Sequence, residues 1–335
     1  MNRSRALVAS CLAAALLVPS VAVAQDADEP LTVYSGRSES LVGPIIEGFT
    51  DATGIGVEVK YADTAELAAI LLEEGDRSPA DVYFAQDAGA LGAAADAGLL
   101  AELPQDVLAA VPVGFSDADG QWAGVSGRAR TAAYTTAESL ELPDSILDFT
   151  DPEWAGRIGW APANGSFQAF VTALRVIEGE DVAREWLEGI LANDPVAYPK
   201  NTAAVEGVAA GEVDVAFVNH YYLLRLLAEN GEDYPVAQQF FGGGDPGSLI
   251  NVAGVGQVAS TNQPEASLAF IEYLLGEEAQ AYFSESTYEF PLLEGVEADP
   301  RLPTIDSIEA PEVDLSDLAD LQGTVELLRE VGAID

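Results

Sequence analysis

The sequence predicts an α/β protein with two lobes, each a mainly parallel sheet flanked by helices, and with hinge crossovers between the lobes. Strand-like and helix-like segments alternate three times between residues 31 and 100, which is typical of parallel strands with helical crossovers. A similar alternation resumes near residue 156. A chain of 335 residues is long enough to fold as two domains.

The first series of segments begins the N-terminal lobe. Its predicted strands cover residues 31–34, 55–61 and 80–85. Apolar residues at helical spacing predict a helix over about 38–53, a second helix after Asp63, and an alanine-rich helix that ends near residue 100. Asp63-Thr64-Ala65-Glu66 resembles a capping box at the start of the second helix.

The second series continues the pattern and then returns to the first sheet. It comprises predicted strands at 156–161 and 214–219, a helix at 166–177, an extended piece from Ala197, a short helix around Val205, a glycine-rich return segment at 240–256, and helices at 263–275, 277–285 and 318–331. We expect the N-terminal lobe to contain residues 31–127 and about 246–302. The C-terminal lobe should contain residues 128–245 and about 303–335.

The first 24 residues have the features of a secretory signal peptide. Arg3 and Arg5 precede an apolar run that ends in Ala22-Val23-Ala24, and this order is the signature of an exported precursor. We expect cleavage after Ala24; a membrane anchor is disfavoured because polar residues interrupt the apolar run. Cys11 is the only cysteine, so the mature chain should have no disulfide and no thiolate metal site.

The charge of the chain is strongly negative. It has 56 acidic and 14 basic residues, for a formal net charge of −42. This charge would repel a phosphate backbone, so we expect no nucleic-acid partner. A carboxylate-rich surface suits a salt-rich medium, where screening weakens the repulsion, and it also attracts cations.

The composition excludes several kinds of catalytic site. His220 is the only histidine, so a zinc site with several histidines or cysteines cannot form. No nucleophile-elbow motif and no phosphate-loop motif is present. Carboxylates are too numerous for any one pair to indicate hydrolysis.

Two candidate binding segments lie where a predicted strand meets a helix, the position at which open α/β sheets bind ligands. Asn164-Gly165-Ser166 could offer backbone N–H groups and a helix dipole to an anion, or could be an ordinary N-cap. Tyr221 and Tyr222 could supply phenolate oxygens to a hard trivalent cation, or could pack with their hydroxyls at the surface.

Two arginines also stand out in a chain that is poor in basic residues. Arg128 and Arg130 lie in the run SGRAR. A guanidinium group suits bidentate anion binding, and we assign this role to Arg128. We expect Arg130 to form a salt bridge with one of the many carboxylates.

A resemblance to a known family depends on the order and spacing of nine short runs: LTVYSGRSES (31–40), GDRSPADVYFAQDAGAL (75–91), SGRAR (126–130), EWAGRIGW (153–160), NGSF (164–167), PKNTAAV (199–205), VNHYYLL (218–224), DPGSL (245–249) and EFPLL (289–293). With these runs the chain resembles the ferric-iron-binding proteins of ABC importers over about residues 31–334. The resemblance implies the two-lobed periplasmic-binding-protein fold. It also implies a non-enzymatic, periplasmic and monomeric carrier that delivers its ligand to an ABC importer permease.

The resemblance further implies a ferric ion held together with a synergistic anion, phosphate or carbonate. In the family a tyrosine pair binds the iron, and it matches Tyr221 and Tyr222. The positions that hold the anion match Arg128, Asn164, Gly165, Ser166, Asn201 and Asn219.

The N-terminal lobe departs from the family pattern. Ser38 stands where many members have a histidine ligand, Glu39 where some have a tyrosine, Gln86 where others have a glutamate, and Phe167 where one branch has a third tyrosine. Ser38, Glu39, Gln86 and Asp87 are therefore the candidate metal ligands of this lobe.

Three other functions compete with iron binding. The same fold could bind a small anion, an organophosphonate or a thiamine-like organic ligand. A hydrolase with a carboxylate pair would lack a general-base histidine. A pure interaction protein would leave the paired tyrosines at a strand exit without a role.

Overall fold

The computed structural model describes residues 29–335. The predicted signal peptide and Cys11 lie outside these residues. Within residues 29–335, no helix combines the length and the apolar character that crossing a membrane requires.

The strands form one mixed sheet in the order β2-β1-β3-β9-β4-β7-β5-β6. At one end, β1 (Leu31–Ser35) pairs in parallel with β2 (Val57–Tyr61) and β3 (Val82–Ala85). At the other end, β5 (Ile158–Trp160) pairs in parallel with β6 (Val196–Ala197) and β7 (Val215–Asn219). The predicted α/β fold with a parallel group of strands in each lobe is confirmed.

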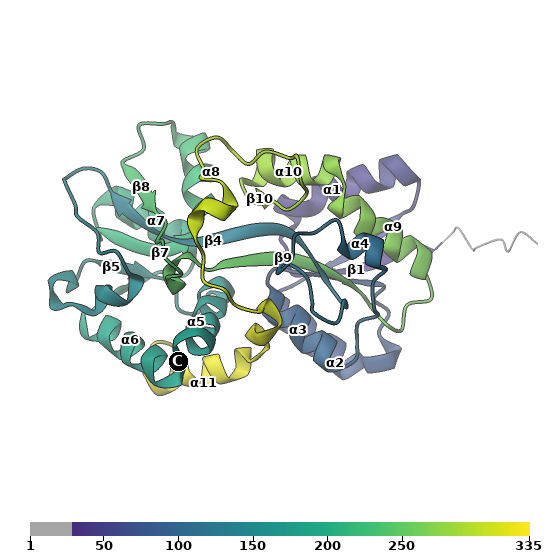
Figure 1. Cartoon of the computed structure of the whole chain (residues 1–335), viewed down its shortest axis with the longest axis horizontal. Helices are drawn as coiled ribbons and strands as arrows, with labels where there is room; N and C mark the ends of the chain where they lie inside the picture. The colour runs from purple at the N-terminus through teal and green to yellow at the C-terminus, as the bar shows by residue number, and fades with distance from the viewer. Residues whose placement is uncertain (1–28) are drawn as a thin grey trace, which may run out of the picture.

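Two long strands join the lobes (Figure 1). β4 (Ala123–Thr135) pairs antiparallel with β9 (Ile250–Gln257) over its first half and with β7 over its second half. The short strands β8 (Val236–Gln239) and β10 (Phe290–Pro291) also pair with β4. The long strands β4 and β9 are the expected hinge crossovers.

No strand was predicted over β4. All but one of its residues are buried, so the strand lacks the alternation of apolar and polar side chains that marks a half-exposed strand. Its glycines, alanines and arginines also have little in common with the branched residues of typical strands. The sequence pattern therefore gave no sign of this long hinge strand.

Helices flank the sheet close to their predicted positions. They are α1 (Glu39–Thr53), α2 (Thr64–Glu74), α3 (Ala88–Asp96), α4 (Gln105–Leu108), α5 (Gly165–Glu178), α6 (Glu180–Ala192), α7 (Asn201–Ala210), α8 (His220–Asn230), α9 (Pro264–Leu275), α10 (Glu277–Thr287) and α11 (Leu321–Glu330). The predicted capping box is wrong, because the Asp63 side chain makes no capping hydrogen bond at the start of α2. Neither α4 nor α6 was predicted.

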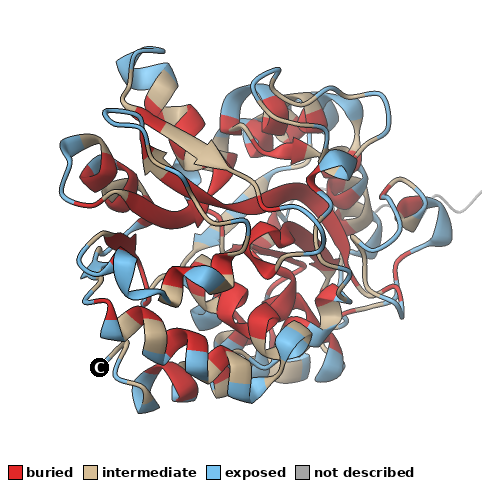
Figure 2. Ribbon diagram, turned by 60° about the vertical axis from the view of Figure 1, so that its left-hand side comes forward, coloured by how far each residue is buried: buried red, intermediate tan, exposed pale blue. Residues whose placement is uncertain are grey.

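Each end of the sheet has its own apolar core, and the hinge strands are buried between the two (Figure 2). The core around β1 and β3 includes Phe49, which meets Phe270 edge to face with ring centroids 5.0 Å apart. The core around β5 and β7 is built from aromatic rings: Phe149, Trp154, Trp160, Phe167, Phe170, Trp186, Phe217 and Phe241. The two ends of the sheet are therefore packed around separate apolar cores.

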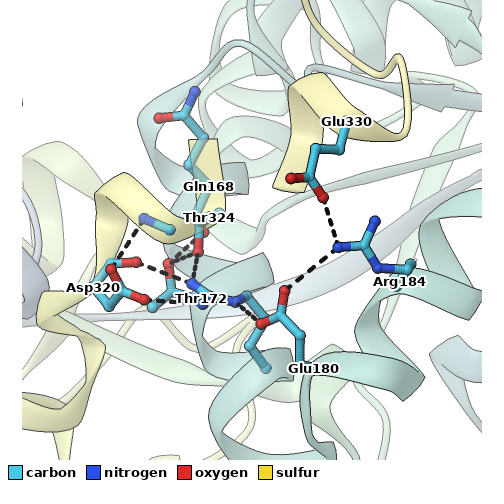
Figure 3. Close-up of polar contacts among 9 residues, drawn as sticks. Gln168, Thr172, Glu180, Arg184, Asp320, Thr324 and Glu330 are labelled. Atoms are coloured by element: carbon cyan, nitrogen blue, oxygen red, sulfur yellow. Dashed lines mark hydrogen bonds and ion pairs between the residues drawn. The ribbon is translucent and has the colours of Figure 1, made fainter. Parts of the chain in front are cut away.

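The C-terminal segment contacts both halves of the molecule. The short 3-10 helix Leu315–Ala319 packs so closely on α3 that a side chain at Gly89 would collide with the Leu318 carbonyl. Farther along, the hydroxyl groups of Thr172 and Thr324 lie 2.7 Å apart and tie α11 to α5 (Figure 3). The division of residues 303–335 between the lobes remains a prediction, and these contacts make that segment a third connection between them.

Candidate functional site

The two predicted tyrosines lie side by side at the start of α8. β7 ends at Asn219 and α8 begins at His220, so both tyrosines follow the carboxyl end of a parallel strand. Their ring centroids are 4.3 Å apart. Tyr221 is buried and Tyr222 is half-buried. The two phenols therefore form one patch rather than two separate packing contacts.

The environment of Tyr221 opposes ionisation of an isolated phenol. Burial raises the pKa of Tyr221 well above its usual value, and a charge on Tyr222 would raise it further. Arg128 and Arg37 act in the opposite direction. Tyr221 is therefore protonated at neutral pH unless a cation replaces the proton.

Arg130 lies on β4 and holds the start of the tyrosine helix. Its guanidinium donates to the Asn219 side-chain oxygen at 3.1 Å and to the Phe217 carbonyl at 2.9 Å. Burial lowers the pKa of Arg130 to about 10. The expected salt bridge of Arg130 is wrong, because within residues 29–335 no carboxylate forms an ion pair with it.

Arg128 lies two residues before Arg130 in β4, so both side chains point from the same face of the strand. Only 3% of its surface is exposed. Within the described chain it makes no hydrogen bond or ion pair, and its Nε atom is buried without a partner. Burial and the neighbouring Arg37 lower the pKa of Arg128. A buried cation with free donors is a site for an anion.

A small cavity between the lobes lies beside the two arginines, but Tyr221 and Tyr222 do not line it. Residues from both lobes line it: Gln86, Asp87, Arg128, Arg130, Ser166, Ala169, Phe170, Asn219, Leu249 and Asn251. The predicted anion residues Arg128, Ser166 and Asn219 thus meet two of the predicted residues of the N-terminal lobe. The hinge strands contribute Arg128, Arg130 and Asn251 to the wall, so hinge motion would reshape the cavity.

Asn164, Ser166 and Asn201 form one hydrogen-bonded group at the start of α5. The Asn164 side-chain oxygen accepts from the Ser166 N–H at 3.0 Å, from the Ser166 hydroxyl at 2.7 Å and from the Asn201 amide at 3.0 Å. The Ser166 N–H is therefore not free, contrary to expectation. The space beside Gly165 is open, since a side chain there would meet nothing within 4 Å.

The four candidates of the N-terminal lobe differ in their placement. Ser38 and Glu39 are exposed at the start of α1 and do not line the cavity. Asp87 is buried and caps α3 by accepting from the Ala90 N–H at 3.0 Å; burial raises its pKa. Gln86 is half-buried beside it. Within residues 29–335, no three histidine or carboxylate side chains gather as a metal-binding group.

An ion pair that the sequence did not predict lies next to the tyrosines. Arg37 and Glu289 are each 1% exposed, and their side chains are 2.5 Å apart. The Ser126 hydroxyl also donates to Glu289 at 2.5 Å. Both charged residues lie in runs already used for the family resemblance, but 252 positions separate them, and pairing over that distance has no local signal.

His220 links the tyrosine helix to the hinge. Its Nδ1 accepts from the Ala129 N–H at 3.1 Å, so its Nε2 carries the proton donated to the Tyr288 carbonyl at 2.8 Å. Burial lowers the pKa of His220 to about 4. The imidazole is neutral at physiological pH and fixes the first residue of α8 between two backbone segments.

Known proteins resemble this chain over almost its whole length. Residues 45–310 match the family model of bacterial extracellular solute-binding proteins. The Fe(3+)-binding periplasmic protein of Serratia marcescens is 32% identical over 96% of both chains. Among solved structures, iron-bound HitA from Pseudomonas aeruginosa has a TM-score of 0.85 at 35% identity, and the match covers 90% of this chain and 99% of HitA.

A second solved structure carries both iron and an organic anion. The Trichodesmium protein IdiA (FutA), in complex with iron and citrate ligands, has a TM-score of 0.78 at 29% identity, and the match covers 91% of this chain and 99% of that protein. These similarities confirm the resemblance drawn from the sequence. The chain belongs to the family of bacterial extracellular solute-binding proteins.

Proposed function

We propose that this protein captures ferric iron in the periplasm, together with a synergistic anion, and delivers it to the permease of an ABC importer. The observation that carries the proposal is the pair of adjacent phenols at the start of α8, where Arg128, buried and unpaired within residues 29–335, opposes the rise that burial causes in the pKa of Tyr221. Relatives that are named as ferric-binding proteins support the choice of iron.

The charges fit a trivalent cation bound with an anion. A ferric ion would displace the protons of Tyr221 and Tyr222, and two phenolates leave one positive charge uncompensated. The free donors of Arg128 would hold phosphate or carbonate on the metal, assisted by the polar group of Asn164, Ser166 and Asn201. Gln86 or Asp87 would complete the shell from the opposite lobe.

Binding would proceed from one lobe to the other. The C-terminal lobe carries both tyrosines and the polar group at the start of α5, so it would take up iron and anion first. Bending of β4 and β9 would then bring Gln86 and Asp87 onto the ligand. The closed monomer would be the form that docks on the permease.

A second candidate ligand is a small anion or an organophosphonate without iron. It is favoured by the free donors of Arg128 and by the lack of a group of three carboxylate or histidine ligands in residues 29–335. A thiamine-like cation fits less well, because two buried arginines line the cavity.

An absorption titration separates these candidates. Iron-free protein titrated with ferric iron and phosphate should develop a visible tyrosinate-to-iron charge-transfer band that saturates at one iron per chain. The double variant Tyr221→Phe with Tyr222→Phe should remain colourless, whereas Tyr234→Phe, near β8, should behave as wild type. A colourless wild-type protein that binds phosphate in calorimetry would favour the second candidate.

A further inference from the structure

Arg37 is a buried arginine with spare hydrogen-bond donors. One of its terminal nitrogens pairs with Glu289, while its Nε and its other terminal nitrogen are buried without a partner. A buried guanidinium normally satisfies all of its donors. Arg37 lies in the loop between β1 and α1, where the family resemblance leads us to expect metal ligands of the N-terminal lobe.

The pair of Arg37 and Glu289 adjoins the tyrosine helix. The residues on either side of Glu289 both contact His220, which precedes Tyr221. The Tyr288 carbonyl accepts from His220, and the Phe290 ring centroid is 4.6 Å from that of the imidazole. Arg37 also lies close enough to Tyr221 and Tyr222 for charges on the phenols to raise its pKa.

The ion pair with Glu289 gives Arg37 a local net charge that differs from that of Arg128. Arg128 has no ion-pair partner in the described residues and is a net cation. Arg37 is neutralised by Glu289, so the pair can direct N–H groups at a phenolate oxygen without adding a net charge that repels a ferric ion.

We propose that Arg37, held and neutralised by Glu289, is a positioning residue of the iron site whose free N–H groups bind the phenolate oxygens of the tyrosine pair. This inference rests on the proposed function. It assigns the N-terminal lobe a contribution from outside the metal shell, in a chain where Ser38 and Glu39 are exposed at the start of α1.

The charge-transfer band reports this role directly. The transition moves an electron from phenolate to iron, so a hydrogen bond or positive charge at the phenolate raises its energy. Arg37→Gln should therefore shift the band to longer wavelength. Glu289→Gln removes the neutralising charge from Arg37 and should shift the band to shorter wavelength. Disruption of a merely structural contact would not move the band in opposite directions.

Two further variants make the test robust. The double variant Arg37→Gln with Glu289→Gln keeps the net charge but loses the guanidinium donors, so its band should lie between those of wild type and Arg37→Gln. Arg157→Gln is the matched control: Arg157 forms a 2.5 Å pair with Asp214 just before β7, at the opposite end of that strand from the tyrosines. Its band should equal that of wild type.

The possible results lead to separate conclusions. If wild type forms the band, and the single variants shift it in opposite directions, Arg37 has the proposed role. If iron-loaded single variants show equal bands, or shifts of the same sign, the role of Arg37 is rejected and iron binding stands. Should a single variant fail to fold, an unshifted double variant rejects the role equally well. If wild type forms no band, the proposed function itself fails.

Discussion

Replacement of Arg128 by methionine should stabilise the iron-free protein while abolishing its response to anions. Arg128 is 3% exposed, lacks a hydrogen bond or ion pair within residues 29–335, and has its Nε atom buried without a partner. Burial of an uncompensated ion costs several kcal/mol. Methionine keeps most of the aliphatic volume and removes that cost.

The size of the effect follows from the surroundings of Arg128. Asp87 and Glu289 stabilise the guanidinium, and Arg37 destabilises it, so only part of the desolvation cost remains. We expect Arg128→Met to raise the free energy of unfolding of the iron-free protein by about 1–3 kcal/mol. Phosphate at 100 times its dissociation constant should stabilise wild type by about 2.7 kcal/mol, and should leave the variant unchanged.

Urea unfolding of iron-free protein, with and without phosphate, measures both quantities. Arg157→Met serves as the control, because Arg157 already has a carboxylate partner. It should gain no stability and should retain the full phosphate effect. A destabilised Arg128→Met variant, or one that phosphate still stabilises, would refute the assignment of Arg128 as a buried cation that awaits an anion.

Three further outcomes are expected. The pKa of His220 is about 4 in the folded chain against 6.5 for an unperturbed histidine. The contribution of His220 to the free energy of unfolding is therefore complete above about pH 6.5 and is lost as the pH falls toward 4. In urea unfolding at constant ionic strength, iron-free wild type should lose about 3 kcal/mol more of this free energy than His220→Gln over the same interval. Asp320 caps α11 by accepting from the Gly323 N–H at 3.0 Å, so Asp320→Ala should cost about 1 kcal/mol in the same assay, and Asp317→Ala, which removes no hydrogen bond, should cost little. With a net charge of −42, the protein should melt at a higher temperature in 1 M than in 0.1 M sodium chloride, because the Debye length falls from about 10 to about 3 Å; a melting temperature that does not rise would contradict this.

Local patterns predicted most of the fold. The parallel groups at both ends of the sheet came from alternating strand and helix signals, and the start of α8 came from a buried strand running into two tyrosines. The hinge strand β4 was missed because it is buried on both faces. The capping box at Asp63 was wrong because sequence spacing cannot show whether a side chain turns toward the helix.

In the candidate site too, local features were predicted from the sequence and features that depend on tertiary packing were not. The tyrosine pair and the turn at Asn164 are local features, so the sequence located both. The pair of Arg37 and Glu289 depends on tertiary packing across 252 positions. Arg130 shows the opposite error: the excess of carboxylates suggested an ion pair, but the side chain lies on a buried strand whose nearest acceptors are an asparagine and a carbonyl.

The most direct test of the account is a crystal structure of the protein loaded with ferric iron and phosphate, with anomalous scattering recorded at the iron edge. We predict one peak per chain, within bonding distance of both the Tyr221 and Tyr222 oxygens and beside an anion that contacts Arg128. A peak bound to surface carboxylates instead, with both phenols free, would contradict it.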